Sequence, residues 1–271
     1  MRRLATVHGR AIDRRLAEAW DRDVPLRHVE LSTKYDVAYY ALTQRIAATI
    51  DACTRNSGLE ILDVGCGLGV LSATLAEQGH RVTGIDISQE SIARAHLDFG
   101  HCAKFRVENV LRLPHEFFGT FDVVVACMVW HNYPHLDDVV AGCRRALKEG
   151  GFLVAAVVEP ASYLVKHGLP HRYDVERRFD LPLRHTHCCG THAPVPYYHR
   201  PVSAYVRALQ RNHFPDAYVV SNAIESELPE NDVITFAGTA AARRLREARQ
   251  PGRQSRHASL PMHVGAEGAS A

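Results

Sequence analysis

The chain has 271 residues, of which 46% are hydrophobic and 23% are charged, and its formal net charge is +2. This length fits one large domain or a core domain with a cap, and the near balance of charge argues against a dedicated nucleic-acid binder. No apolar run approaches the roughly 18 residues of a membrane-spanning helix, and the charged N-terminal sequence lacks the apolar core of a signal peptide.

Two helical stretches precede the first predicted strand. Residues 11–22 predict a charged helix that ends near a turn at Pro25. Residues 31–53 predict a longer amphipathic helix, with apolar side chains at helical spacing along one side. We assign residues 1–55 to an N-terminal helical lid segment.

Residues 59–86 have the pattern of a nucleotide-binding β-α-β unit: an apolar run, a glycine-rich turn, a helical pattern and a second apolar run ending at Asp86. The glycine spacing departs from the G-x-G-x-x-G of dinucleotide dehydrogenases. Gly65 and Gly67 let the backbone approach a ligand, and Asp86 can accept hydrogen bonds from ribose hydroxyls. Asp63 would repel a pyrophosphate but can hold an ammonium group. The pattern predicts a ligand with a ribose and an ammonium group and no phosphate.

The remaining apolar runs predict a complete α/β sheet. Ser88 is expected to cap the helix after the second strand. Further strands are expected at 104–107, 121–127 and 152–158, and a closing hairpin at 218–224 and 232–239. We therefore predict an α/β fold with a doubly wound, mostly parallel seven-stranded sheet.

The motifs DVGCGLG, GIDIS, FDVVV and LKEGG occur in this order, and together they resemble the class I (Rossmann-like) S-adenosylmethionine (SAM) dependent methyltransferases over residues 59–158. The resemblance implies a SAM-binding core at 56–158 and closing strands at 216–242. A substrate lid would be inserted at 159–215. We expect a disordered basic tail at 243–271.

The resemblance implies SAM as the cofactor. Tyr35 belongs to a segment that resembles the family's Tyr-Asp lid sequence, although its tyrosines could instead pack the helix to the core. Asn109 stands where the family has an acid, and its amide oxygen could accept a hydrogen bond from the adenine amine. The expected cofactor contacts are Tyr35, Asp63, Gly65, Cys66, Gly67, Asp86, Ile87, Asn109, Val110 and Cys127.

Methyl transfer to oxygen also needs a base. His131, just past the fourth strand, is the first candidate and His199 the second; His131 could instead pack the loop. Arg200 could hold a substrate carboxylate or pin the lid. The expected substrate contacts are Trp130, Tyr198 and Arg200.

A His- and Cys-rich sequence at 185–192 leaves three readings open: structural zinc, a catalytic metal, or a histidine-rich lid loop. Thiolates and imidazoles are zinc ligands, but the sequence lacks a CxxC pair and a second pair at familiar spacing. We expect no metal. The seven cysteines have no disulfide-framework spacing, so we expect reduced thiols and a cytoplasmic protein.

We therefore expect a SAM-dependent methyltransferase that acts on an O, N or C atom of a small molecule, with specialised metabolism as its setting. The alternative is a protein of the same fold that binds SAM and catalyses a cyclisation or decarboxylation, or only binds it. RNA or protein methylation is disfavoured, because no N-P-P-Y-like tetrad follows the fourth strand. As a monomer or homodimer, the protein would bind neither nucleic acid nor membrane.

Overall fold

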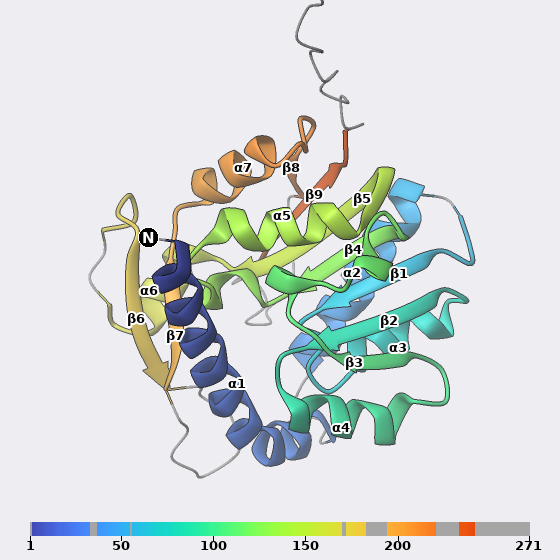
Figure 1. The fold of residues 1–271 in the computed structure, drawn as a ribbon, viewed down its shortest axis with the longest axis horizontal. Coiled ribbons are helices and arrows are strands. Elements are labelled where there is room, and N and C mark those ends of the chain that lie inside the picture. The colour runs from blue at the N-terminus through green and yellow to red at the C-terminus, as the bar shows by residue number, and fades with distance from the viewer. Residues whose placement is uncertain are drawn as a thin grey trace, which may run out of the picture.

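The computed structural model describes residues 2–32, 37–54, 56–169, 172–182, 194–220 and 233–241. Its main feature is a seven-stranded sheet with the strand order β3-β2-β1-β4-β5-β9-β8 (Figure 1). The strands are β1 (Glu60–Val64), β2 (Arg81–Asp86), β3 (Lys104–Val107), β4 (Phe121–Cys127), β5 (Leu147–Val158), β8 (Tyr218–Val220) and β9 (Val233–Thr239). The predicted seven-stranded α/β fold is confirmed.

Strands β1 to β5 pair in parallel, whereas β9 is antiparallel to both β5 and β8. Successive side chains of a strand point to opposite faces, and in β4 both faces are apolar. Val123 and Val125 enter one apolar cluster, whereas Val124 and Ala126 enter the other. A parallel sheet covered on both faces requires this continuous apolar sequence.

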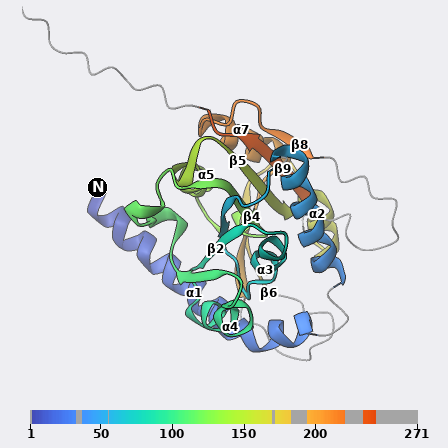
Figure 2. The same cartoon turned by 90° about the vertical axis from the view of Figure 1, so that its right-hand side faces the viewer.

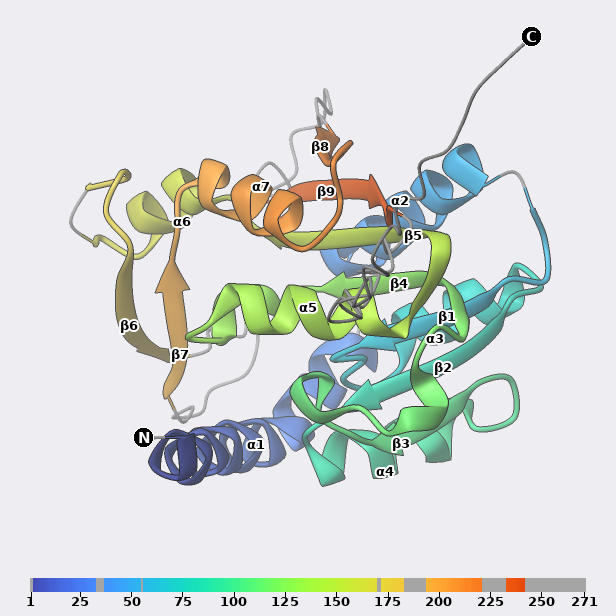
Figure 3. The same ribbon diagram turned by 45° about the horizontal axis from the view of Figure 1, so that its top comes forward.

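Helices cover the two faces of the sheet (Figure 3). Ile46 of α2 and Leu71 of α3 join the cluster of Val123, whereas Val140 of α5 and Leu209 of α7 join the opposite cluster. The sheet is therefore doubly wound. These helices are α2 (Val37–Thr54), α3 (Val70–Glu77), α5 (Leu136–Ala146) and α7 (Val202–Arg211).

Helix α4 (Gln89–Phe99) follows β2. The Ser88 hydroxyl accepts a hydrogen bond from the backbone N–H of Ser91 at 3.0 Å, which is the N-cap contact that the sequence predicts. This cap begins α4 directly beyond Asp86, so the end of β2 and the start of α4 are held together.

Helix α1 (Arg2–Ser32) does not end at Pro25 as predicted, since Pro25 lies inside it. A proline inside a helix removes one backbone hydrogen bond and bends the helix, and α1 changes direction towards its C-terminal end (Figure 2). The second predicted helix begins at Val37 rather than at residue 31, because residues 31 and 32 belong to α1. Tyr35 lies outside the described residues.

A second sheet pairs β6 (Arg177–Pro182) with β7 (Pro194–His199) in antiparallel register. Together with α6 (Pro160–Lys166) it lies at one end of the main sheet, beside the N-terminal half of α1 (Figure 1). It occupies part of the predicted inserted segment. No helix in the described part of the chain is both long and apolar enough to span a bilayer.

Candidate active site

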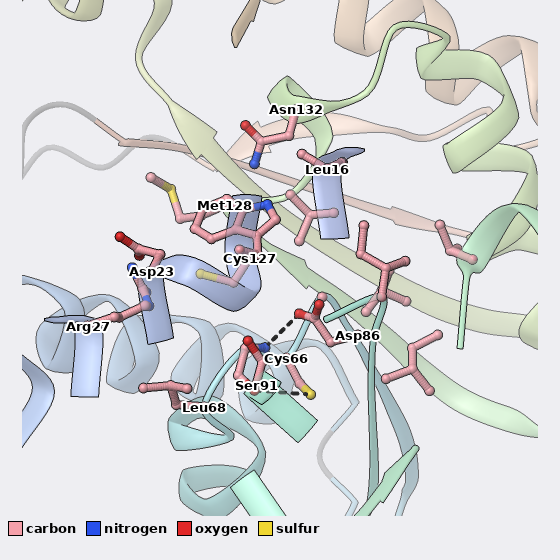
Figure 4. Close-up of a pocket in the computed structure, with 18 of the residues that line it drawn as sticks. Leu16, Asp23, Arg27, Cys66, Leu68, Asp86, Ser91, Cys127, Met128 and Asn132 are labelled. Atoms are coloured by element: carbon pink, nitrogen blue, oxygen red, sulfur yellow. Dashed lines mark hydrogen bonds between the residues drawn. The ribbon is translucent and has the colours of Figure 1, made fainter. Parts of the chain in front are cut away.

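A cavity lies at the carboxyl ends of β1, β2 and β4 and is bordered by α1 (Figure 4). Its empty space, including the part open to solvent, is about 920 Å³, and small-molecule sites usually measure ~300–1,000 Å³. Open α/β sheets bind ligands at this edge. The predicted cofactor contacts that line the cavity are Gly65, Cys66, Gly67, Asp86, Ile87, Val110 and Cys127.

The turn after β1 depends on glycine at two positions. Gly65 has φ +69°, and a Cβ there would lie 2.3 Å from Cγ2 of Val129. Gly67 has φ +53°, and a Cβ there would meet nothing within 4 Å. Both conformations are unfavourable for residues with a Cβ. Gly65 therefore permits close packing against the loop after β4, whereas Gly67 leaves open space beside the cavity.

Both carboxylate oxygens of Asp86 are fixed by backbone donors. Its Oδ2 accepts from Gly67 N–H at 3.0 Å, and its Oδ1 accepts from Ser88 N–H at 2.9 Å. Burial raises the pKa of Asp86, while these two hydrogen bonds and the charge of Arg27 oppose the rise. A carboxylate has about four acceptor positions, so Asp86 retains acceptor capacity towards the cavity.

Asp63 and Asn109, two of the predicted cofactor contacts, have side chains engaged elsewhere and do not belong to the described lining of the cavity. Oδ2 of the buried Asp63 accepts from the Ser72 hydroxyl at 2.7 Å. Burial raises the pKa of Asp63 to about 7; the Ser72 hydrogen bond opposes this rise and the nearby charge of Asp86 adds to it. Oδ1 of Asn109 caps a short 3-10 helix by accepting from Leu111 N–H at 2.8 Å.

Helix α1 supplies a wall that the sequence interpretation missed. The side chains of α1 that line the cavity are Leu16, Trp20, Asp23, Val24 and Arg27. Their spacing is that of one helical face, which is the signal that could have identified them. Further lining residues that were not among the predicted contacts include Tyr39 of α2, Ser91 in the first turn of α4, and Glu108 directly after β3.

The loop after β4 contains a residue in an unusual conformation. Met128 lines the cavity and has φ 61°, in the left-handed region that residues other than glycine rarely adopt. Its backbone N–H donates to the carbonyl of Ala156 at 2.8 Å. Such strain persists where surrounding contacts enforce it, often at functional sites. The conformation places Met128, Asn132 and Tyr133 along the same cavity.

Trp130 lies next to these residues but is not available to a substrate. It is fully buried and stacks on Tyr205 of α7, with ring centroids 6.5 Å apart. Its side chain points into the core on the α5 and α7 face of the sheet, where Val140 also packs. The prediction of a substrate contact at Trp130 is therefore corrected.

Of the two predicted catalytic histidines, His131 lies in the loop after β4 and His199 is the last residue of β7, and neither belongs to the described lining of the cavity. His131 is buried, and its Nδ1 has no hydrogen-bond partner among the described residues. Burial, with the charge of Arg200, lowers the pKa of His131 to about 4. His199 is also buried, and its Nε2 lies 3.0 Å from the carbonyl oxygen of Tyr173.

Arg200 follows β7 and holds the loop after β4. Its guanidinium donates to the carbonyls of Tyr133 at 2.7 Å and Pro134 at 2.8 Å, and it lies 5.3 Å from the ring centroid of Tyr198. Arg200 is buried, so these contacts correspond to the pinning role that the sequence left open. Tyr198, half-buried, supports the guanidinium.

The described residues contain no cluster of three or more metal-binding side chains. The His- and Cys-rich sequence at 185–192 lies outside them. The expectation of no metal therefore stays a prediction.

Comparisons with known proteins match the core of the chain. The family model described as "Methyltransferase domain" matches residues 62–155. A ubiquinone biosynthesis O-methyltransferase of Dechloromonas aromatica is 37% identical over 120 residues, which cover 42% of this chain and 52% of that protein. The chain thus spans about half the length of the curated relatives it matches.

Solved structures share the fold at lower sequence identity. A 1,6-didemethyltoxoflavin-N1-methyltransferase of Burkholderia thailandensis, with S-adenosylhomocysteine bound, matches with a TM-score of 0.57 at 19% identity over 83% of this chain and 89% of that chain. The [4+2]-cyclase SpnF matches with a TM-score of 0.58 at 16% identity over 83% of this chain and 94% of that chain. At such identities the likeness concerns the fold alone.

Proposed function

We propose that the chain transfers the methyl group of SAM to a small molecule, because a methyltransferase-domain model matches residues 62–155 and the motifs resemble those of the class I SAM-dependent methyltransferases. The observation that carries the proposal is the cavity in which the Gly65–Gly67 turn and Asp86 meet at the carboxyl edge of the sheet. Catalysis in such a site consists mainly of alignment of the reacting groups and exclusion of water.

The residues of the cavity fit this cofactor. SAM supplies an electrophilic methyl group on a sulfonium. Asp86 would accept hydrogen bonds from the ribose hydroxyls, and Ile87 would pack against the adenine. The adenine amine is assigned to Glu108, which lines the cavity, rather than to Asn109. The space beside Gly67, which a Cβ would occupy, leaves the backbone accessible to the ligand.

The acceptor side is assigned to the loop after β4, where Met128, Asn132 and Tyr133 line the cavity. We propose His131 as the base for an oxygen acceptor. It neighbours Asn132, its Nδ1 has no partner among the described residues, and its lowered pKa keeps it in the neutral, proton-accepting form at pH 7. An oxygen acceptor agrees with the names of the matched relatives, which are O-methyltransferases.

Calorimetric titration with SAM and with S-adenosylhomocysteine tests the proposal. We expect micromolar binding of both ligands by the wild-type protein and at least tenfold weaker binding by Asp86→Ala. Asp180→Ala is the matched control, because Asp180 lies on β6, outside the described lining of the cavity, and pairs with Arg178. No binding by the wild-type protein would contradict the proposal.

Turnover is tested with a panel of hydroxylated small molecules by measuring S-adenosylhomocysteine release. Release that depends on the acceptor is the expected result. Tight SAM binding without any release of S-adenosylhomocysteine would instead favour the alternative of a SAM-binding protein that does not methylate.

A further inference from the structure

The amino-acid end of the cofactor carries one ammonium and one carboxylate, and both groups need partners of opposite charge in the cavity. Asp63, the acid that the sequence assigns to the ammonium, is 1% exposed and is engaged by the Ser72 hydroxyl at 2.7 Å. Burial also raises its pKa to about 7, so Asp63 is partly protonated near neutral pH and is a weak counter-charge. The described lining of the cavity contains three acids, Asp23, Asp86 and Glu108, and the last two are assigned above to the ribose and the adenine.

Helix α1 brings an acid and a base to the same cavity. Asp23 and Arg27 both line it. They are four residues apart and therefore lie on one face of the helix. Asp23 is only 4% exposed, whereas Arg27 is half-buried. Figure 4 shows both side chains reaching in from α1, on the other side of the view from Asp86. This pair presents opposite charges side by side to a ligand.

The guanidinium of Arg27 lies near the carboxyl ends of β2 and β4. Its guanidinium carbon lies 5.3 Å from the ring centroid of Tyr39, which also lines the cavity. Its charge acts to lower the pKa of Asp86 at the end of β2 and of Cys127 at the end of β4, against the rise that burial causes in both. Arg27 therefore faces the space between the ribose-binding acid and β4.

We infer that Asp23 and Arg27 recognise the amino-acid end of SAM, with Asp23 accepting hydrogen bonds from the ammonium and Arg27 donating to the carboxylate. The inference rests on the proposed function and assigns to α1 a role in selecting the ligand. Charged hydrogen bonds in a cavity shielded from water are the strong ones. Adenosine compounds without an amino-acid group would bind weakly.

The test compares S-adenosylhomocysteine with 5′-methylthioadenosine, which keeps the adenosine and the thioether but lacks the amino-acid group. In calorimetric titration we expect the wild-type protein to bind S-adenosylhomocysteine at least about tenfold more tightly. Asp23→Asn and Arg27→Gln should each weaken S-adenosylhomocysteine binding by about tenfold or more and change 5′-methylthioadenosine binding by less than about threefold. Glu18→Gln is the control, because Glu18 is an exposed acid of the same helix.

A third ligand separates the two side chains. Decarboxylated S-adenosylhomocysteine keeps the ammonium, so Asp23→Asn should weaken its binding and Arg27→Gln should not. Equal affinity of the wild-type protein for the first two ligands would overturn the inference even if a variant failed to fold. Equal weakening of both ligands in the variants would also overturn it. Failure of the wild-type protein to bind any of these ligands would instead count against the proposed function.

Discussion

The two walls of the cavity are built by different means. The wall formed by β1, β2 and β4 depends on the course of its backbone, which is fixed by hydrogen bonds such as those from Gly65 and Cys66 N–H to the Ile85 carbonyl at 2.7 and 3.0 Å. The wall formed by α1 is made of side chains on one helical face, and α1 is joined to the core by contacts such as Arg112 to Asp13 at 2.7 Å. The first wall should therefore respond to added atoms, and the second to changed charge.

Substitution of Gly65 by alanine gives the largest expected effect on the backbone wall. The new Cβ would lie 2.3 Å from Val129 at a φ of +69°. We expect the free energy of unfolding to fall by about 2–4 kcal/mol, measured by urea denaturation. Gly119→Ala is the matched control, since its φ is +63° and a Cβ there would meet nothing within 4 Å. It should lose only about 1–2 kcal/mol. Similar losses in both variants would mean that the contact with Val129 costs nothing.

His131→Gln concerns the boundary between the backbone wall and the inserted segment. If His131 is the base, kcat for an oxygen acceptor should fall by about 10²-fold or more, while the affinity for S-adenosylhomocysteine stays unchanged. His135→Gln, on the same loop but without a predicted role, is the control. An unchanged kcat in His131→Gln would remove His131 from the mechanism.

The pKa of His131 can be measured without a substrate. Because burial lowers it to about 4, the ring should stay neutral between pH 5 and 8 in an NMR titration. The acid limb of the pH–rate profile should lie near pH 4, and not near the ordinary histidine value of about 6.5. A limb near 6.5 would point to another base.

Asp63→Asn tests the raised pKa of Asp63, whose side chain points away from the cavity. Its pKa of about 7 in the folded protein is above the ordinary 3.8, so the folded state binds more protons than the unfolded state between these values. The contribution of protonated Asp63 to the free energy of unfolding is fully present below about pH 4 and is lost as the pH rises through about 7. The asparagine side chain does not titrate, so the variant does not lose stability in this way. The free energy of unfolding of the variant minus that of the wild type should therefore increase by about 1–3 kcal/mol between pH 4.5 and pH 8. A difference independent of pH would show that Asp63 titrates normally.

Ser88→Ala has the smallest expected effect and concerns the joint between the two walls. The Ser88 hydroxyl accepts from Ser91 N–H and donates to Asp21 of α1 at 2.6 Å. Loss of the cap should lower the free energy of unfolding by about 1 kcal/mol. Combining it with Asp21→Ala in a double-mutant cycle separates the cap from the tie to α1. Additive effects would show that the tie contributes nothing.

The backbone wall was predictable because its determinants are local. Strand, glycine turn and acid follow each other within residues 59–86, so Gly65, Gly67 and Asp86 could be assigned to one site before any tertiary contact was known. The same holds for the Ser88 cap. The positions of the strands followed from the apolar runs, and the doubly wound, mostly parallel sheet followed from these runs and the family resemblance.

The remaining features depend on orientation, which the chain pattern does not determine. Asp63 turns away because the hydroxyl of Ser72, nine positions later, donates a hydrogen bond to its carboxylate. Trp130 sits in a loop that can turn either way, and its stacking on Tyr205 decides the side. The face of α1 was missed because the predicted stop at Pro25 separated Trp20 from Arg27, although both belong to one helix.

The position of α1 has a consequence for the rate of turnover. A spent cofactor would lie between the glycine turn and α1. Any outward movement of α1 during its release would break the hydrogen bond from the Ser88 hydroxyl to Asp21 at 2.6 Å. We expect this movement to set an upper limit on the number of catalytic cycles per second. The bend at Pro25 is a natural hinge for it, because the backbone there already lacks one helical hydrogen bond.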